Sequence, residues 1–175
     1  MVWLGAAWLA DAFLLANGWR CALLAAPWLI VAALGLLHWS WIAWPQGASF
    51  APARTALLSC VFGVLGVGWV LVLLDPVSAS PLPWLPLLNP AELAQLAVLA
   101  LLARWAWSAQ SPVLLQRWRV TALGVLGWAL LTGSTLHSVH HWGGVPWDTE
   151  LLGATLSQTS LTIVWSVLGV LGWVI

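Results

Sequence analysis

Charge is what this sequence has least of. Only 6% of its 175 residues are charged, and lysine and tyrosine are absent altogether. A soluble domain typically carries about 25% charged residues. A chain with so few charges cannot cover a water-facing surface, so lipid is its expected solvent. The formal net charge is zero, which leaves no basic surface for nucleic acid.

Cysteine is also scarce. The two cysteines, Cys21 and Cys60, form no CxxC pair and no disulfide framework. The spans assigned below place them near opposite faces of the membrane, whereas a disulfide needs Cα atoms within about 7 Å. We therefore expect both thiols to be free, and a secreted disulfide-stabilised protein is excluded.

Long apolar runs are abundant, because 62% of the residues are hydrophobic. A membrane-spanning helix needs about 20 such residues. We predict an all-α, polytopic transmembrane helix bundle that forms a single domain over residues 1–175. Both ends of the sequence are apolar and uncharged, which predicts a fragment of a longer polytopic chain. About six spans are expected, near residues 2–17, 20–44, 54–75, 90–108, 118–141 and 151–175.

Two connections between these spans carry most of the unusual residues. DPVSASPLPWLP, residues 75–86, holds four prolines and is expected to be an ordered, non-helical loop. The helix that follows has a strong start signal in LLNPAEL. Asn89 can cap it, Pro90 suits its first position, and Glu92 can reach back to the cap. The second connection is HSVHHWGGVPWDTE, residues 137–150.

The arginines predict the orientation. Four of them, Arg54, Arg104, Arg117 and Arg119, fall at one end of the predicted spans, and only Arg20 falls at the other. The positive-inside rule places the four-arginine end in the cytoplasm. Both termini are then cytoplasmic, and the Pro-rich and His-containing loops share the outer, periplasmic or extracellular face. The tryptophans cluster at both ends, where they are expected to form aromatic belts at the headgroup level.

Three of the four histidines, His137, His140 and His141, lie within five residues of one another. A helix that continues through residue 141 would place them on one face, because i, i+3 and i, i+4 neighbours share a face. His137 and His141 are candidate ligands for a divalent metal, although the sequence requires no cofactor. The alternative is a polar helix end, hydrogen-bonded to water and to loop carbonyls.

Together the two loops predict a polar pocket on the outer face. Its hypothetical substrate is a lipid-linked or cell-envelope glycan, with an acidic residue as base, histidine as proton carrier and aromatic rings holding the sugar. Whether the protein is an enzyme is left open. The candidate catalytic residues are His140, His141, Glu92 and Asp148. The candidate ligand-binding residues are Asn89, His137, Trp142, Trp147 and Trp84.

Two other functions compete with this one. A transporter or channel segment would need polar groups in mid-membrane, and Asp11 is the clearest intramembrane charge, although structural pairing with Arg20 is an alternative. A non-enzymatic scaffold would need close helix packing through small residues. The expected packing stripe on the last helix is Thr155, Thr159, Thr162, Ser166 and Gly169. The expected packing glycines are Gly63, Gly66, Gly68, Gly124 and Gly127.

Residues 75–175 resemble a known family. PLPWLPLLNPAELAQLAVLALLARW and HSVHHWGGVPWDTELLGATLSQTSLTIVWSVLGVL are similar to the C-terminal part of a bacterial family of multi-pass membrane proteins, catalogued as domain of unknown function 2339. The likeness rests on residues 86–90, on residues 140–147 and on Trp165. His137 departs from the family, which tends to carry arginine nearby. The resemblance implies a bacterial inner-membrane location, with the bilayer and the rest of a longer chain as partners, and implies no activity.

Overall fold

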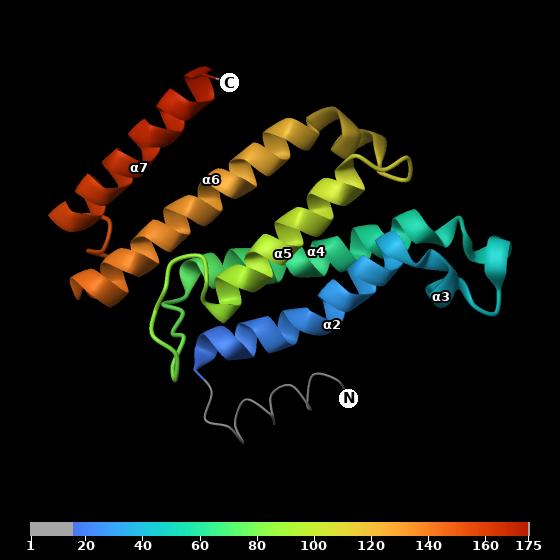
Figure 1. Cartoon of the computed structure of the whole chain (residues 1–175), viewed down its shortest axis with the longest axis horizontal. Coiled ribbons are helices and arrows are strands. Elements are labelled where there is room, and N and C mark those ends of the chain that lie inside the picture. The colour runs from blue at the N-terminus through green and yellow to red at the C-terminus, as the bar shows by residue number, and fades with distance from the viewer. Residues whose placement is uncertain (1–15, 175) are drawn as a thin grey trace.

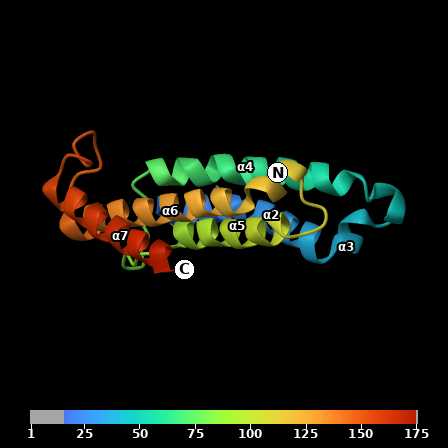
Figure 2. The same cartoon turned by 90° about the horizontal axis from the view of Figure 1, so that it is seen from above.

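The computed structural model describes residues 16–174, apart from the side chains of Ala48 and Val174, and this part of the chain is helical without any strand. The predicted all-α membrane bundle is confirmed. Successive long helices run in opposite directions between the same two ends of an elongated bundle (Figures 1 and 2). The helices are α2 (Asn17–Leu37), α3 (Trp39–Ala43), α4 (Ala53–Leu74), α5 (Pro90–Ala106), α6 (Val113–Gly143) and α7 (Thr155–Val174), with a 3-10 turn at Gly47–Phe50.

Four of these helices are long and apolar enough to cross a membrane, whereas five spans were expected of the described residues. α5 is the exception, because its 17 residues reach only about 26 Å at 1.5 Å per residue. The first expected span, with Asp11, lies outside the described residues. The expected helix at 20–44 is broken at His38, which separates α2 from α3. The four candidate spans are Asn17–Leu37, Ala53–Leu74, Val113–Gly143 and Thr155–Trp173.

The bundle has two chemically different ends. We call one the loop end, where α4 and α6 finish, α2 and α5 begin, and residues 75–89 form a long connection (Figure 1). We call the other the arginine end, because Arg54, Arg104, Arg117 and Arg119 lie there, near the start of α4, the end of α5 and the start of α6.

The apolar core lies between these ends. α2, α4 and α5 pack against one another, α6 packs on α5, and α7 packs on α6 (Figures 1 and 2). Close packing of this kind removes apolar surface from contact with lipid or water and holds the helices at fixed registers. The buried core consists of Ala32, Leu58, Val61, Phe62, Leu65, Trp69, Val98, Trp105 and Leu130.

The residues expected to bring helices together are not the ones that do so. All five glycines predicted for that role have open space where a Cβ would lie. Close approach occurs instead at Gly35, where a Cβ would stand 2.9 Å from Cδ2 of Leu58, and at Gly133, where it would stand 2.6 Å from Cδ2 of Leu73. Spacing alone predicts a helix face that permits close approach. The position of the neighbouring helix decides at which residue that approach requires a glycine.

The small-residue stripe of α7 is a second wrong prediction. All five of its members are exposed within this chain. The opposite side of α7 packs on α6 instead, through buried Ser157 and Leu161. The indole of Trp165 also donates a hydrogen bond to the Thr132 hydroxyl at 3.1 Å. Ser157, Leu161 and Trp165, rather than the predicted stripe, therefore form the α6–α7 contact.

Candidate functional site

The loop of residues 75–89 is non-helical backbone at the end of the membrane-spanning helices. Its carbonyl groups need donors, because a buried and unpaired backbone group is costly and lipid offers no replacement. The start of α2 supplies the first of them. The carbonyl of Ser78 accepts from the backbone N–H of Gly18 at 3.0 Å. The carbonyl of Ala79 accepts from the indole N–H of Trp19 at 3.2 Å.

The start of α5 holds the other half of the loop. Asn89 is the N-cap, as predicted, and its side-chain oxygen accepts from the N–H of Glu92 at 3.0 Å. The carboxylate of Glu92 does not return to the cap. It accepts instead from the N–H of Leu87, a residue in the left-handed region with φ of 62°. A non-glycine residue pays about 1–2 kcal/mol in that region, so the hydrogen bond to Glu92 helps to hold the turn.

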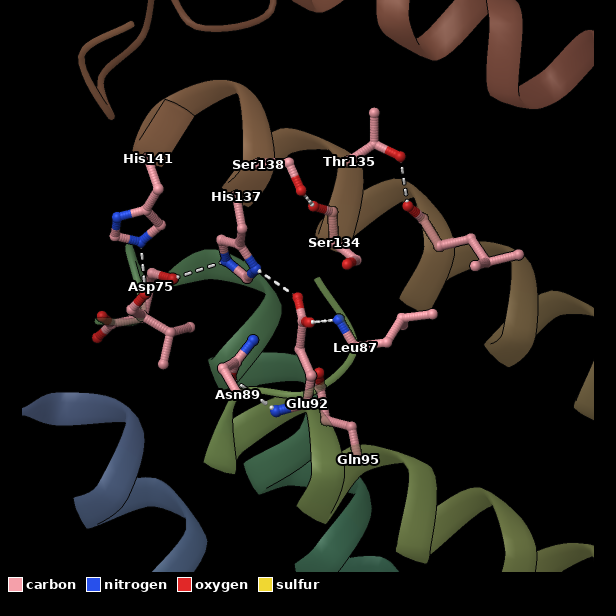
Figure 3. Close-up of polar contacts among 12 residues, drawn as sticks. Asp75, Leu87, Asn89, Glu92, Gln95, Ser134, Thr135, His137, Ser138 and His141 are labelled. Carbon is pink, nitrogen blue, oxygen red and sulfur yellow. Dashed lines mark hydrogen bonds and ion pairs between the residues drawn. The ribbon is translucent and has the colours of Figure 1, made fainter. Parts of the chain in front are cut away.

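A buried contact between a carboxyl group and an imidazole ring joins α5 to α6. Oε1 of Glu92 lies 3.3 Å from Nδ1 of His137, and both residues are 0% exposed. The other ring nitrogen of His137, Nε2, lies 3.0 Å from the backbone oxygen of Asp75 (Figure 3). One imidazole thus connects the end of α4, the start of α5 and the end of α6.

The hydrogen bonds constrain where the protons of this pair lie. A carbonyl oxygen only accepts, so Nε2 of His137 must carry a hydrogen that it donates to Asp75. Either Glu92 is a carboxylic acid that donates to a neutral imidazole, or it is a carboxylate that accepts from an imidazolium. Both forms hold the same number of protons and are neutral overall. The buried pair therefore carries no net charge, which limits its desolvation cost.

Aromatic rings enclose the pair. Trp147 stacks on His137 with ring centroids 4.8 Å apart, and its indole N–H donates to the carbonyl of Leu74 at 3.2 Å. Trp84 stacks on His141 with centroids 4.3 Å apart and is itself buried. Two of the three tryptophans expected to hold a sugar therefore use a ring face on a histidine of the same chain.

The two remaining histidines of the cluster also bond to main-chain oxygens. Nε2 of His141 donates to the carbonyl of Val77 at 2.6 Å. Nδ1 of His140 donates to the carbonyl of Val145 at 2.7 Å, just after α6 ends. That end is made by Gly144, whose φ of 67° is a left-handed conformation that glycine adopts without a Cβ clash.

Some predicted site residues stay outside the cluster. Trp142 is exposed. Asp148 is also exposed and uses its Oδ1 to accept from the N–H of Glu150 at 2.9 Å, as a turn residue would. Asp11 lies outside the described residues. The residues that the structure brings together are Glu92, Asn89, His137, His140, His141, Trp84 and Trp147.

The cluster does not form a metal site in this arrangement. Within residues 16–174, no three His, Cys, Asp or Glu side chains lie close enough together to hold a metal ion. His137 has both ring nitrogens in hydrogen bonds, so it has no lone pair directed at an open position. Cys21 and Cys60 are free thiols, as the sequence predicts.

A large cavity lies beside the cluster rather than in it. It has a volume of about 730 Å³ and is bordered by α2, α4 and α5, with a mostly apolar lining. Its polar members are Asn17 and Asp75, which hydrogen-bond to each other at 2.7 Å, and Gln95, whose amide donates to the carbonyl of Trp69 at 3.0 Å. Sequence reasoning missed Gln95, although an amide inside an apolar helix was a usable signal.

One family model matches this architecture and sequence. It is described as "Predicted membrane protein (DUF2339)" and matches residues 1–175. The chain belongs to the DUF2339 family. The match extends the likeness noted for residues 75–175 over the first helices as well. No curated protein and no solved structure matches the DUF2339 chain. The family and the apolar helices agree on a membrane location.

Proposed function

We propose that this DUF2339 chain is a non-enzymatic membrane scaffold whose loop end is locked by the Glu92–His137 pair. One observation carries the proposal. The ring N–H groups of four side chains each donate to a carbonyl of the chain's own backbone, at the end of a helix or in a loop. A ring N–H that already donates to the chain's own backbone is not available as a donor to a substrate. The four side chains are His137, His140, His141 and Trp147.

The scaffold has a physical reason to use these groups internally. A buried polar group left without a partner costs about 1–3 kcal/mol, and a long loop at the edge of the bilayer contains many such groups. Side chains on α5 and α6 supply the donors and acceptor that the loop lacks. The ordered loop then fixes the relative positions of α2, α4, α5 and α6 at this end.

The glycan hypothesis uses the same residues as acid, base and stacking surface. It needs open space over the histidines, whereas no histidine lines the apolar cavity between α2, α4 and α5. Two of its three candidate stacking rings, Trp84 and Trp147, are each already stacked on a histidine, and the third, Trp142, is exposed outside the cluster. The transport hypothesis relies on Asp11, outside the described residues. The internal hydrogen bonds therefore favour the scaffold over the glycan hypothesis.

Replacing Glu92 by glutamine separates the scaffold from proton chemistry. In Glu92→Gln the new amide can donate to Nδ1 of His137 while its oxygen accepts from Leu87, so the geometry is kept and the titratable proton is lost. We expect wild-type thermal stability within about 1 kcal/mol. We also expect unchanged fitness when this variant is the only copy, measured by competition against wild-type and deletion strains.

The control is Glu150→Gln, which removes an exposed carboxylate at the same end of the bundle. A Glu92→Gln protein that folds with wild-type stability but competes no better than the deletion strain would reject the scaffold. That result would show that the proton, rather than the hydrogen bonds, is needed, and it would restore the acid–base hypothesis.

We also propose that the arginine end faces the cytoplasm of a bacterial inner membrane. The four arginines at one end support it through the positive-inside rule. In a cysteine-free background, Thr149→Cys at the loop end should react with a membrane-impermeant maleimide on cells whose outer membrane has been permeabilised. Ala109→Cys at the arginine end should react only after lysis. The reverse pattern would invert the orientation.

A further inference from the structure

A second, polar cavity lies at the arginine end, away from the histidine cluster. Its volume is about 520 Å³, and three elements border it: the end of α2, the start of α4, and the end of α5 with the turn that follows. Polar and charged side chains dominate its lining, unlike that of the cavity near the loop end. The lining residues are Leu36, Arg54, Arg104, Trp107, Ser108 and Gln110.

Two arginines line this cavity with different degrees of restraint. Nε of Arg54 donates to the carbonyl of Gly35 at 2.8 Å, and its Nη2 donates to that of Leu36 at 3.1 Å. Arg54 thereby caps the end of α2 and still has three of its five N–H donors left. Arg104 makes no hydrogen bond or ion pair with any residue in the described part of the chain. The hydroxyl of Ser108 is buried and has no partner there either.

No described acidic residue is near enough to neutralise these arginines. Asp75 ends α4, Glu92 lies in the first turn of α5, and Asp148 and Glu150 follow α6. All four belong to the loop end, a helix length away from the cavity. Two like charges sharing one cavity repel each other, so an anion from outside the chain would relieve that repulsion.

The position of the cavity relative to the membrane surface indicates which anion is available. Trp107 lines it, and other exposed tryptophans lie at the same end. Indole rings prefer the headgroup level of a bilayer, so the cavity opens where phospholipid phosphates lie. The planar guanidinium fork matches phosphate oxygens in a bidentate manner. The exposed tryptophans at this end include Trp41, Trp44, Trp107 and Trp118.

We propose that the cavity between Arg54 and Arg104 binds the phosphate group of an anionic phospholipid. Arg54, held in place by the end of α2, provides a fixed donor set. Arg104 closes on the phosphate from α5, and Ser108 supplies a neutral hydroxyl. A basic pocket between helices at the membrane surface is a general means of holding acidic lipid headgroups.

Native mass spectrometry of the full chain in detergent tests the proposal. Phosphatidylglycerol and phosphatidylcholine with the same acyl chains are titrated separately into lipid-depleted protein. We expect phosphatidylglycerol to bind more tightly than phosphatidylcholine. Arg104→Gln should weaken its apparent affinity about five-fold, since one arginine near the headgroups contributes about that factor. Arg104 has no described intramolecular bond, so this variant should fold.

The matched control is Arg117→Gln, which removes a charge at the same end but outside the cavity. The Arg117 guanidinium lies over the ring of its neighbour Trp118, and its removal should leave the lipid affinity unchanged. An equal loss of phosphatidylglycerol affinity in the two variants would mean that general surface charge, rather than this cavity, attracts the lipid. That result would overturn the site. Equal binding of the two lipids would overturn it as well. Displacement of phosphatidylglycerol by millimolar inorganic phosphate would show a free-anion site and overturn the lipid assignment.

Discussion

The two ends of the bundle solve the same problem in opposite ways. At each end a helix stops and leaves carbonyl groups without intrahelical partners. The loop end satisfies them with histidine ring N–H groups around a Glu92–His137 pair that is neutral overall. The arginine end satisfies them with a full positive charge, because Arg54 caps α2. The first solution is closed and inward-facing, whereas the second leaves charge available to a ligand.

Replacing His137 by alanine should cause the largest loss of stability and so test this comparison most strongly. Glu92 would lose its partner while remaining buried, and the carbonyl of Asp75 would lose a donor. Removing one member of a buried pair typically costs about 3–5 kcal/mol. We expect a large loss of unfolding free energy in detergent and proteolysis within residues 75–89. His38→Ala removes an exposed histidine near the arginine end and should change neither quantity.

Adding a methyl group at Gly18 should have the next largest effect. Its Cβ would lie 2.5 Å from the backbone oxygen of Ser78, so the loop itself would have to move. Forced repacking of this kind typically costs about 1–3 kcal/mol. Gly68→Ala is the control, because no atom lies within 4 Å of its Cβ position. Thermal unfolding should show a loss for Gly18→Ala and no loss for the control.

Replacing Trp147 by phenylalanine tests a single donor at the loop end. The ring keeps its stacking on His137, but the carbonyl of Leu74 loses its hydrogen bond. We expect a decrease of about 1 kcal/mol in unfolding free energy. Trp142→Phe, at an exposed tryptophan of the same end, should have no effect. Equal stability of both variants would mean that the Trp147 bond does not help to hold the loop end.

The smallest effect on stability is expected at the arginine end. Arg104→Gln removes a charge without any described internal partner, so lipid-free protein should unfold within about 0.5 kcal/mol of the wild type. Added phosphatidylglycerol should stabilise the wild type more than this variant. A large loss in lipid-free protein would show that Arg104 is structural and that the two ends resemble each other more than we propose.

Local chemistry made part of the loop end predictable. The Asn89 cap, Pro90 at the first helical position and the non-helical proline-rich loop depend on neighbours within a few residues, and the structure confirms all three. Glu92 was assigned to a capping box, whereas its carboxylate bonds to Leu87 and His137. The partner is 45 residues away in the sequence, and no local pattern connects the two.

Helix faces were less predictable than helix ends. The stripe of α7 and the glycines of α4 have the spacing of packing surfaces, yet the stripe is exposed and the glycines make no close approach to a described helix. A small residue permits close approach but does not attract a neighbour. The face of α7 that meets α6 instead carries buried Ser157 and Leu161, and Trp165, which donates a hydrogen bond to Thr132.

The sequence by itself determined the solvent, the helical class and the separation of charge between the two ends. These follow from composition and from the order of residues along the chain, since apolar runs and arginines act wherever they occur. Only the tertiary structure decided that His137 is a buried bridge and that Arg54 and Arg104 share a cavity. The reason is geometric, because hydrogen bonds need atoms within about 3 Å of each other. Only the packing of one helix against another brings residues so distant in the sequence that close together.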